Sequence, residues 1–510
     1  MPTGPVTPMI PNVQHFEAAM AGWAPTRDTC LVVGSQASAA TQETAATLAS
    51  ELVTEGWMHV PPPIVEQRKG PDDIALTVAP VPEVTHTEGY RLHVADGLHA
   101  TGVDETGLFY ATRTLLQTLR TQQGRYSGII TDWPVHGYRG VMLDIGRKYF
   151  TPAWIEQFIR NMSYVKLNEL QLHIAENTGF RIQSDTHPEV VSKRHLTKAQ
   201  VREILATARR YHVDVVPSVD TPSHAKQLLA THPEWQLKLT NGRILPDKVD
   251  YSIPAAREFV KDILGEMCDL FEASSRFQLG SDEFFPYPWE NGPVTPQSAP
   301  QLVAYAHEVG GTTIYDGFHA YLNELGDVVR AKGKIAAVWN DDINPDNQAL
   351  PLNKSTEIYI WIRWNQTKPT ATDYVDAGYP VLNANGDYLY FIVNTDGSCC
   401  TQHPDPKKSP QGIYDRWTPR TFMGAAGGAG DHILPEGKPM LGAQVEIWCD
   451  NPKVLDETEI AEKFVPWMRT FAQQVWGSPK IAPTYDAGFL EISDAVGDAP
   501  ADAIRQRPWQ

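Results

Sequence analysis

From about residue 138 onward, the chain alternates short apolar runs with longer segments that have the pattern of amphipathic helices. Eight runs have the length and composition of buried strands: 140–144, 169–173, 213–217, 276–280, 334–339, 357–361, 381–385 and 441–448. Such an alternation is typical of a parallel sheet covered by helices. Eight repeats favour a closed barrel over an open sheet. We therefore predict an α/β chain with a (β/α)8 TIM barrel.

Local sequence signals mark where several of the barrel helices begin. Pro152 follows Thr151, and proline is favoured in the first turn of a helix. Residues 197–200 and 456–459 each resemble a capping box ahead of a long amphipathic run,. The predicted helices start directly after these signals.

The residues ahead of the barrel lack this alternation and mix strand and helix patterns. Asp96-Gly97, a hairpin-turn dipeptide, joins apolar runs at 90–94 and 99–103, and a helical pattern follows at 105–121,. We predict a small N-terminal α+β support domain at 1–132, the barrel at 133–478, and a C-terminal surface tail at 479–510.

Charge and cysteine content exclude several classes of partner. The 43 Lys and Arg against 61 Asp and Glu give a net charge of −18, which disfavours nucleic acid and anionic membranes as partners. No apolar stretch approaches the roughly 20 residues of a membrane span, and the first residues lack the pattern of a signal peptide, so a cytoplasmic location is expected. The five cysteines have neither C-x-x-C pairs nor metal-ligand spacing, so neither a disulfide framework nor a zinc site is indicated,. No other motif suggests a metal or a cofactor, and we expect none. The sequence leaves open whether the chain forms a homodimer.

The active site of such a barrel lies at the carboxyl ends of its strands. Charged and aromatic residues follow nearly every predicted strand: Asp144, Arg147, His173, Glu176, Asp220, His224, Asp282, Glu283, Trp339, Trp361, Asp387, Tyr388, Trp448 and Asp450. Charged groups suit sugar hydroxyls and aromatic faces suit sugar rings, so this set favours a carbohydrate site.

The adjacent carboxylates Asp282 and Glu283 follow an apolar strand and a glycine. Neighbouring residues at a strand end point in different directions, so these two carboxylates can serve different parts of one substrate. Two carboxylates with separate roles are the usual equipment of a glycosidase.

Several ordered motifs make the chain, from about Leu31 to Trp476, similar to a known family. The motifs are Tyr90-Arg-Leu-His-Val94, the segment 107–115, Arg139-Gly-Val-Met-Leu-Asp-Ile-Gly-Arg147, Leu279-Gly-Ser-Asp-Glu283, Asp387-Tyr-Leu-Tyr390 and the segment 442–450. Together they resemble the family 20 glycoside hydrolases, the β-N-acetylhexosaminidases. The last two motifs are most similar to the branch of bacterial surface hexosaminidases and lacto-N-biosidases.

The resemblance implies retaining, substrate-assisted catalysis, in which the substrate's 2-acetamido oxygen attacks the anomeric carbon and forms an oxazolinium ion. Glu283 would act as general acid and then as general base, with a pKa raised by burial or by Asp282. Asp282 would stay ionised and orient the acetamido N–H, and Tyr388 would donate its hydroxyl to the acetamido oxygen.

The resemblance also implies a set of substrate contacts. Trp339, Trp361 and Trp448 would enclose the acetamido methyl group and the sugar ring, with Trp361 preferred over Trp364 for its place. Arg139 and Asp450 would bind ring hydroxyls, and His173 and His224 complete the set: Arg139, His173, His224, Trp339, Trp361, Trp448 and Asp450. His224 would support Glu283, whereas His173 could equally be a core residue.

One position departs from the family pattern. Two aspartates usually follow the histidine of the second strand, whereas this chain has Glu176 and Asn177 after His173. Glu176 can still pair with His224 without contacting the substrate, but its side chain is longer than that of the usual aspartate, which changes the geometry.

The expected substrates are oligosaccharides or glycoconjugates that end in β-linked GlcNAc or GalNAc. Arg139 is expected to hold the 3- and 4-hydroxyls and to close the pocket, which favours exo-acting release of one sugar. Two alternatives remain: release of a disaccharide, as lacto-N-biosidases do, and a catalytically silent carbohydrate-binding barrel. Intact Asp282 and Glu283 argue against the silent barrel.

Overall fold

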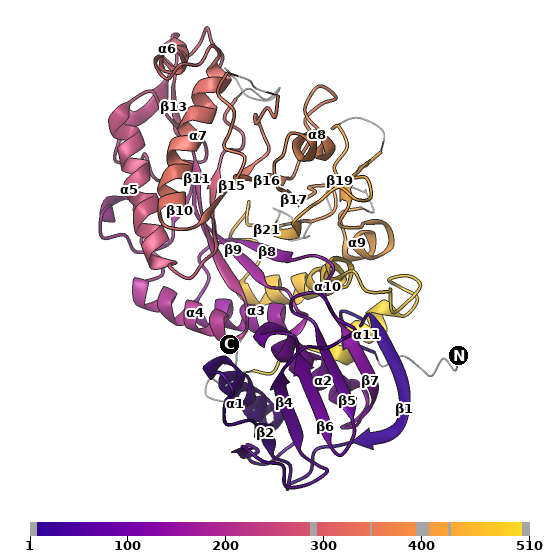
Figure 1. Cartoon of the computed structure of the whole chain (residues 1–510). Coiled ribbons are helices and arrows are strands. Elements are labelled where there is room, and N and C mark those ends of the chain that lie inside the picture. Colours follow the sequence, from indigo (N-terminus) through magenta and orange to yellow (C-terminus); the bar gives the residue numbers. More distant parts are fainter. Residues whose placement is uncertain (1–7, 286–292, 347–348, 394–406, 427–429, 502–510) are drawn as a thin grey trace.

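The structure is a computed structural model that describes residues 8–285, 293–346, 349–393, 407–426 and 430–501. Figure 1 shows two parts, a sheet with helices near the N-terminus and a larger barrel, with α11 (Phe489–Val496) from the C-terminal end of the chain beside the N-terminal sheet. The predicted α/β class is confirmed: a small α+β domain comes first in the chain and a TIM barrel follows it.

The N-terminal part is a seven-stranded sheet in the order β1-β7-β5-β6-β4-β2-β3. Its strands are β1 (His15–Trp23), β2 (Leu31–Val33), β3 (Ile64–Val65), β4 (Ile74–Val78), β5 (Tyr90–Val94), β6 (Leu98–Gly102) and β7 (Tyr126–Asp132). The predicted hairpin is present, because β5 and β6 pair antiparallel. Helices α1 (Ala39–Thr54) and α2 (Glu105–Thr121) pack on this sheet.

Eight parallel strands form the barrel, and all eight correspond to predicted runs. In spatial order they are β8 (Tyr138–Asp144), β9 (Glu169–Glu176), β11 (Asp214–Thr221), β14 (Arg276–Gly280), β15 (Ile335–Trp339), β16 (Glu357–Ile360), β17 (Val381–Asn383) and β21 (Gly442–Trp448). The last strand pairs with the first, from Gly442 opposite Tyr138 to Ile447 opposite Leu143. This pairing closes the barrel.

Helices surround the barrel, and the predicted start signals lie where expected. The helices are α3 (Pro152–Tyr164), α4 (Lys198–Arg210), α5 (Pro254–Leu270), α6 (Pro300–Glu308), α7 (Ile314–Ala331), α8 (Ala371–Asp376), α9 (Pro410–Arg416) and α10 (Glu457–Trp476). Thr197 and Asp456 form the capping boxes of α4 and α10. Gly477, with a φ of 80°, ends α10 in the left-handed conformation that favours glycine,.

Short extra strands lie outside the ring of eight barrel strands. They are β10 (Gly179–Phe180), β12 (Gln236–Lys238), β13 (Ile244–Val249), β18 (Tyr390–Ile392), β19 (Thr421–Phe422) and β20 (His432–Ile433). Strand β18 pairs parallel with the carboxyl end of β21, so that Tyr390 lies opposite Glu446 and Ile392 opposite Trp448. This pairing places β18 at the mouth of the barrel.

The two parts of the chain meet through α2. Gln117 of this helix donates a hydrogen bond to the Tyr164 carbonyl of α3 at 2.7 Å. The predicted C-terminal surface tail contains a helix, α11 (Phe489–Val496), which packs against α2 with Phe489 and Val496 buried. These apolar side chains explain why the segment folds back onto the protein.

Cys30, Cys268 and Cys449 are buried and form no disulfide, whereas Cys399 and Cys400 lie outside the described residues. Within the described part of the chain, no helix combines the length and the apolar character that crossing a membrane requires.

Candidate active site

The carboxyl ends of the barrel strands surround one cavity of about 550 Å³. Its walls are Arg147, His224, Asp282, Glu283, Trp339, Trp361, Ile362, Gly386, Asp387, Tyr390, Ile392, Lys408, Met423, Trp448 and Asp450. Residues that follow β8, β11, β14, β15, β16, β17 and β21 all contribute. The cavity therefore lies where a TIM barrel places its active site.

A tight turn at the end of β14 directs both catalytic candidates into the cavity. Gly280, Ser281 and Glu283 have φ values of 81°, 86° and 53°, and non-glycine residues in this region store strain that is common at functional sites. Gly280 cannot be replaced without rearrangement, since a Cβ atom there would lie 1.8 Å from Oδ1 of Asp220. The turn thus places Asp282 and Glu283 beside Asp220.

His224 connects three carboxylates below this turn. Its Nδ1 lies 2.8 Å from Oε1 of Glu176, and its Nε2 lies 3.4 Å from both Oδ2 of Asp282 and Oε2 of Glu283. Burial lowers the pKa of His224, but the charges of Glu176 and Asp282 raise it, and the net shift is far upward. His224 is therefore a cation at neutral pH.

Glu176 makes the contact with His224 that the sequence led us to expect. The carboxylate also pairs with Arg147 at 2.5 Å. Burial raises the pKa of Glu176, whereas His224 and Arg147 lower it, to about 2 overall. The glutamate at this position therefore reaches His224 as an ionised group despite its greater length.

The pKa of Glu283 shifts in the direction opposite to our expectation. Burial does raise the pKa of Glu283, but the hydrogen bond and the charge of His224 lower it, as do the charges of Lys248 and Arg147. The net shift is downward. The prediction was wrong because it considered burial and Asp282 and left out the cationic neighbours.

Asp220 is fully buried beside the catalytic pair. Burial raises its pKa far above the ordinary value, and the charge of Asp282 raises it further. Asp220 is therefore neutral, and a neutral carboxyl group can donate a hydrogen bond to a neighbouring carboxylate.

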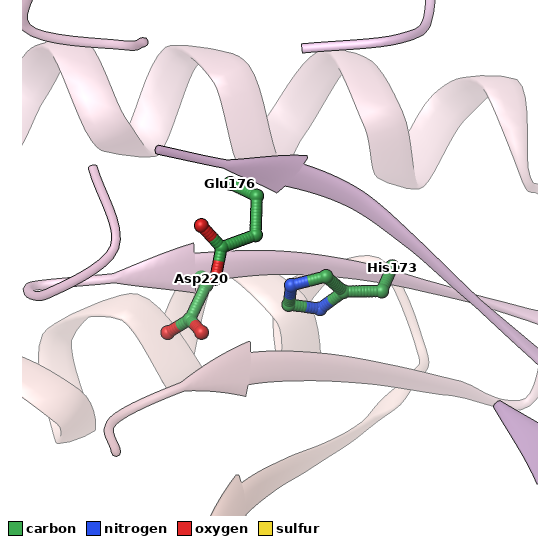
Figure 2. Close-up of side chains that lie close together, drawn as sticks. All are labelled: His173, Glu176 and Asp220. Carbon is green, nitrogen blue, oxygen red and sulfur yellow. The ribbon is translucent and has the colours of Figure 1, made fainter. Parts of the chain in front are cut away.

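Figure 2 shows the Glu176 carboxylate and the His173 ring directed toward the Asp220 carboxyl group. One ligand atom of each lies within 4.8 Å of the others, so geometry alone would allow them to hold a cation. However, the Glu176 carboxylate is already paired with Arg147 and His224. We therefore assign these residues to the network beneath the catalytic pair.

Aromatic side chains form part of the cavity wall. Trp361 stacks on Tyr390, with ring centroids 5.8 Å apart and planes 5° apart. The indole N–H groups of Trp361 and Trp364 both donate to the Asp341 carboxylate, at 2.6 and 2.7 Å. Trp361 faces the cavity together with Trp339 and Trp448, whereas Trp364 does not. The arrangement agrees with the preference for Trp361 over Trp364.

Tyr388 does not face the cavity, and this corrects the sequence assignment. Its hydroxyl donates to Oδ2 of Asp431 at 3.1 Å, while Tyr390 lines the cavity between Trp361 and Trp448. Tyr388 belongs to the turn before β18, whereas Tyr390 is held by pairing with β21. Tyr390 is therefore the tyrosine that can reach a bound substrate.

Arg139 is also misassigned, because it lies at the opposite end of the barrel. Its side chain is 0% exposed, pairs with Glu88 at 2.8 Å, and donates to Tyr110 Oη at 3.1 Å and the Lys166 carbonyl at 2.9 Å. Arg139 is the second residue of β8 and lies at the interface with the N-terminal domain. It cannot contact a substrate in the cavity.

The arginine of the cavity is Arg147, which follows the other end of β8. It pairs with Asp144 at 2.8 Å, and its Nη1 lies 3.9 Å from Oδ1 of Asp450. Asp450 lines the cavity as predicted, and burial raises the pKa of Asp450. Arg147 and Asp450 thus form the polar wall available to ring hydroxyls.

His173 lies beneath the cavity and not on its surface. The imidazole is fully buried, with Nδ1 3.3 Å from the Ser218 hydroxyl and the ring edge-on to Trp448 at 5.3 Å. The core interpretation of His173 is therefore correct, and the substrate-binding one is wrong.

Sequence reasoning missed five further residues that face the cavity: Ile362, Gly386, Ile392, Lys408 and Met423. They are not of the charged or aromatic types that were expected at the strand ends, or they stand far from any predicted strand end. Arg147 and Tyr390 carried a usable signal, since each stands within a recognised motif near a predicted strand end.

Family models match almost the whole chain. The model described as glycosyl hydrolase family 20, catalytic domain, matches residues 136–479, and the model described as glycosyl hydrolase family 20, domain 2, matches residues 6–133. The first match alone covers more than half of the chain and contains every residue of the cavity.

The chain is also similar to curated proteins. It is 27% identical over 432 residues to a lacto-N-biosidase of Bifidobacterium bifidum, a match that covers 83% of this chain and 36% of that protein. It is 26% identical over 337 residues to a β-hexosaminidase of Akkermansia muciniphila, which covers 60% of this chain and 64% of that protein. The chain thus spans about a third of the first relative and under two thirds of the second.

Solved structures share the fold at low sequence identity. A mutant Streptomyces plicatus β-hexosaminidase in complex with GlcNAc has a TM-score of 0.73 at 20% identity, covering 96% of this chain and 94% of that one. A Vibrio harveyi exo-β-N-acetylglucosaminidase has a TM-score of 0.75 at 17% identity, covering 99% of this chain and 79% of that one. The likeness extends over both parts of the molecule.

Proposed function

The chain belongs to glycosyl hydrolase family 20, and on this basis we propose that it is a retaining exo-β-N-acetylhexosaminidase. The proposed substrates are glycans with a terminal, non-reducing β-linked GlcNAc or GalNAc. One observation carries the proposal: Asp282 and Glu283 share a cavity and are both contacted by Nε2 of a cationic His224.

The proposed first step breaks the glycosidic bond. The acetamido carbonyl oxygen attacks the anomeric carbon as its bond to the leaving oxygen breaks, and Glu283 gives its proton to that oxygen. Asp282 accepts a hydrogen bond from the acetamido N–H and faces the positive charge that develops on the ring. Tyr390 donates its hydroxyl to the acetamido oxygen and holds it in place.

The second step releases the sugar. Glu283, now a carboxylate, takes a proton from a water molecule, and the water oxygen attacks the anomeric carbon from the side that the leaving group vacated. The bond between that carbon and the acetamido oxygen breaks, and the acetamide is restored. Two inversions at one carbon give net retention.

Glu283 must be protonated when the glycosidic bond breaks. In the free protein its pKa is lowered mainly through His224, although 33% of its side chain is exposed. A bound sugar covers that exposed part and removes water, and such desolvation raises the pKa of a carboxyl group. We infer that substrate binding supplies the upward shift that the empty site lacks.

Exo action is proposed on the basis of Arg147 and Asp450, which both line the cavity. Arg147 takes the role that the sequence assigned to Arg139. In the ring of strands, β21 and β8 lie across the barrel from β14, which carries Glu283. A sugar whose anomeric carbon faces Glu283 therefore directs its far hydroxyls at Arg147 and Asp450. An arginine fork suits two neighbouring oxygens, and together the two side chains close the cavity behind one sugar.

Disaccharide release is the second candidate, favoured by the similarity to a lacto-N-biosidase over 432 residues. A comparison of p-nitrophenyl β-GlcNAc with p-nitrophenyl lacto-N-bioside separates the two functions. The exo-hexosaminidase proposal expects higher kcat/KM for the first substrate. A clear preference for the second would replace it with disaccharide release, and hydrolysis of neither would favour a silent binding protein.

A further inference from the structure

We propose that a second cavity beside the active site binds the leaving part of a neutral oligosaccharide, a conclusion that rests on the proposed function. This cavity has a volume of about 490 Å³ and is lined by residues that include Tyr315, Asp342, Asn344, Arg363 and Lys368. We call it the leaving-group cavity.

Neighbouring residues of the same two segments line the two cavities. After β15, Asp341 accepts hydrogen bonds from the indoles of Trp361, which lines the active site, and Trp364, while the next residue, Asp342, faces the leaving-group cavity. After β16, Trp361 faces the active site and Arg363 faces the leaving-group cavity. Consecutive segments thus present side chains to both, and one glycan can extend from the first cavity to the second.

Packed side chains connect the leaving-group cavity to the segment that carries Glu283. Glu283 delivers its proton to the leaving oxygen, so the sugars beyond the cleaved bond begin at Glu283. Two residues later, Phe285 packs against Tyr315 with ring centroids 4.7 Å apart. Tyr315 is itself part of the cavity wall, so a contact path connects the acid to this cavity.

The lining chemistry suits sugar hydroxyls and a sugar face. Asp342 is only 7% exposed, and its Oδ2 has no hydrogen-bond partner among the described residues, while Oδ1 accepts from Lys368 at 2.7 Å. A buried acceptor without a partner is costly, and a hydroxyl group would satisfy it. The side chain of Tyr315 is 39% exposed. Among the described residues, the other large apolar side chains that are exposed are all aliphatic, so Tyr315 is the one that offers an aromatic face.

The balance of charge favours a neutral ligand. Asp342, Asp346 and Asp373 line the leaving-group cavity together with Arg363 and Lys368, so the acidic groups slightly outnumber the basic ones. Lys368 is already paired with Asp342. The excess of carboxylates would repel an anionic glycan. A neutral glycan offers hydroxyl groups that can both donate and accept hydrogen bonds.

Steady-state kinetics of Tyr315→Ala on two substrates tests the proposal. Chitotriose places sugars beyond the cleaved bond, whereas p-nitrophenyl β-GlcNAc does not. We expect about a threefold to tenfold loss of kcat/KM on chitotriose, through KM, because an aromatic contact is removed, and an unchanged value on the nitrophenyl substrate. Ile335→Ala is the matched control, since Ile335 is also 39% exposed but begins β15 at the other end of the barrel.

Asp342→Asn provides a second variant, because it keeps the shape of the side chain and changes only its charge and hydrogen bonding. It should also weaken chitotriose hydrolysis selectively, with thermal melting used to confirm folding. Equal losses on both substrates, or no loss on either, for both folded variants would overturn the leaving-group cavity while leaving the hexosaminidase proposal intact. If the wild-type protein hydrolyses neither substrate, the proposed function fails first.

Discussion

Nδ1 of His224 lies 2.8 Å from Oε1 of Glu176, on the side of the imidazole away from the catalytic pair. Apart from burial, which acts in the opposite direction, the charge of Glu176 is the largest influence on the pKa of His224. The protonation of the histidine that contacts Asp282 and Glu283 is therefore controlled by Glu176, which contacts the opposite nitrogen of the same imidazole ring.

Glu176→Gln should lower the pKa of His224, because it removes the charge that stabilises the imidazolium. NMR titration of the histidine side chains would measure the shift, with wild-type protein as the reference. The alkaline side of the pH profile of activity should move to lower pH with it. A His224 resonance that titrates at the same pH in both proteins would contradict this coupling.

Stability should also depend on pH through this pair. The pKa of Glu176 falls from an ordinary 4.5 to about 2 on folding, so its contribution is present above pH 4.5 and is lost as the pH falls toward 2. The pKa of His224 is raised, so its contribution is complete below about pH 6.5 and is lost as the pH rises through the folded value. Both contributions are complete between about pH 4.5 and 6.5.

Thermal melting of wild type and Glu176→Gln from pH 2 to pH 9 checks this window. The difference in Tm should be largest between about pH 4.5 and 6.5 and should shrink on both sides. A difference that stays constant over the whole range would show that the variant acts through packing alone.

Tyr390→Phe should reduce kcat strongly, by about 10²- to 10³-fold, because it removes a hydroxyl directed at the reacting acetamido group. Tyr388→Phe is the control two residues away, and it loses only the hydrogen bond to Asp431. It should keep most of the activity. Kinetics of both variants on p-nitrophenyl β-GlcNAc decide the assignment, and the opposite ranking would restore Tyr388 as the catalytic tyrosine.

The two arginines of the β8 motif should have separable effects. Arg147→Lys keeps the positive charge but loses the fork, so KM should rise and kcat should fall on the substrate. Arg139→Ala removes the partner of Glu88 at a buried interface and should lower the free energy of unfolding by about 3–5 kcal/mol,. Urea denaturation and kinetics should be measured on both variants. A large loss of stability in Arg147→Lys, or a rise in KM in folded Arg139→Ala, would contradict these separate roles.

The barrel could be predicted because its strands are apolar runs at regular intervals, and the position of Asp282 and Glu283 followed from the strand before them. The errors arose where one motif offered two residues of the same type. Arg139 is the second residue of the seven-residue strand β8 and Arg147 follows the end of that strand, so the two lie at opposite ends of the barrel. Tyr388 and Tyr390 would share a face in a continuous strand, but the turn before β18 separates them.

The electrostatic state of the site could not be predicted from one segment of sequence. The pKa of Glu283 depends on His224, which follows β11, on Lys248 of β13 and on Arg147, which follows β8. Only the folded barrel brings these three cations to the carboxylate at the end of β14. Their combined effect outweighs burial, which was the influence that the sequence indicated.

Attack by the acetamido oxygen of the substrate is tested most directly by weakening that oxygen as a nucleophile. Replacing the N-acetyl group of p-nitrophenyl β-GlcNAc by mono-, di- and trifluoroacetyl groups withdraws electrons from the carbonyl oxygen and changes little else. If the substrate supplies the nucleophile, kcat/KM should fall steeply with each added fluorine, in Tyr388→Phe as in wild type. Equal rates across the series, or a covalent sugar ester on Asp282 or Glu283 detected by mass spectrometry, would contradict substrate-assisted catalysis.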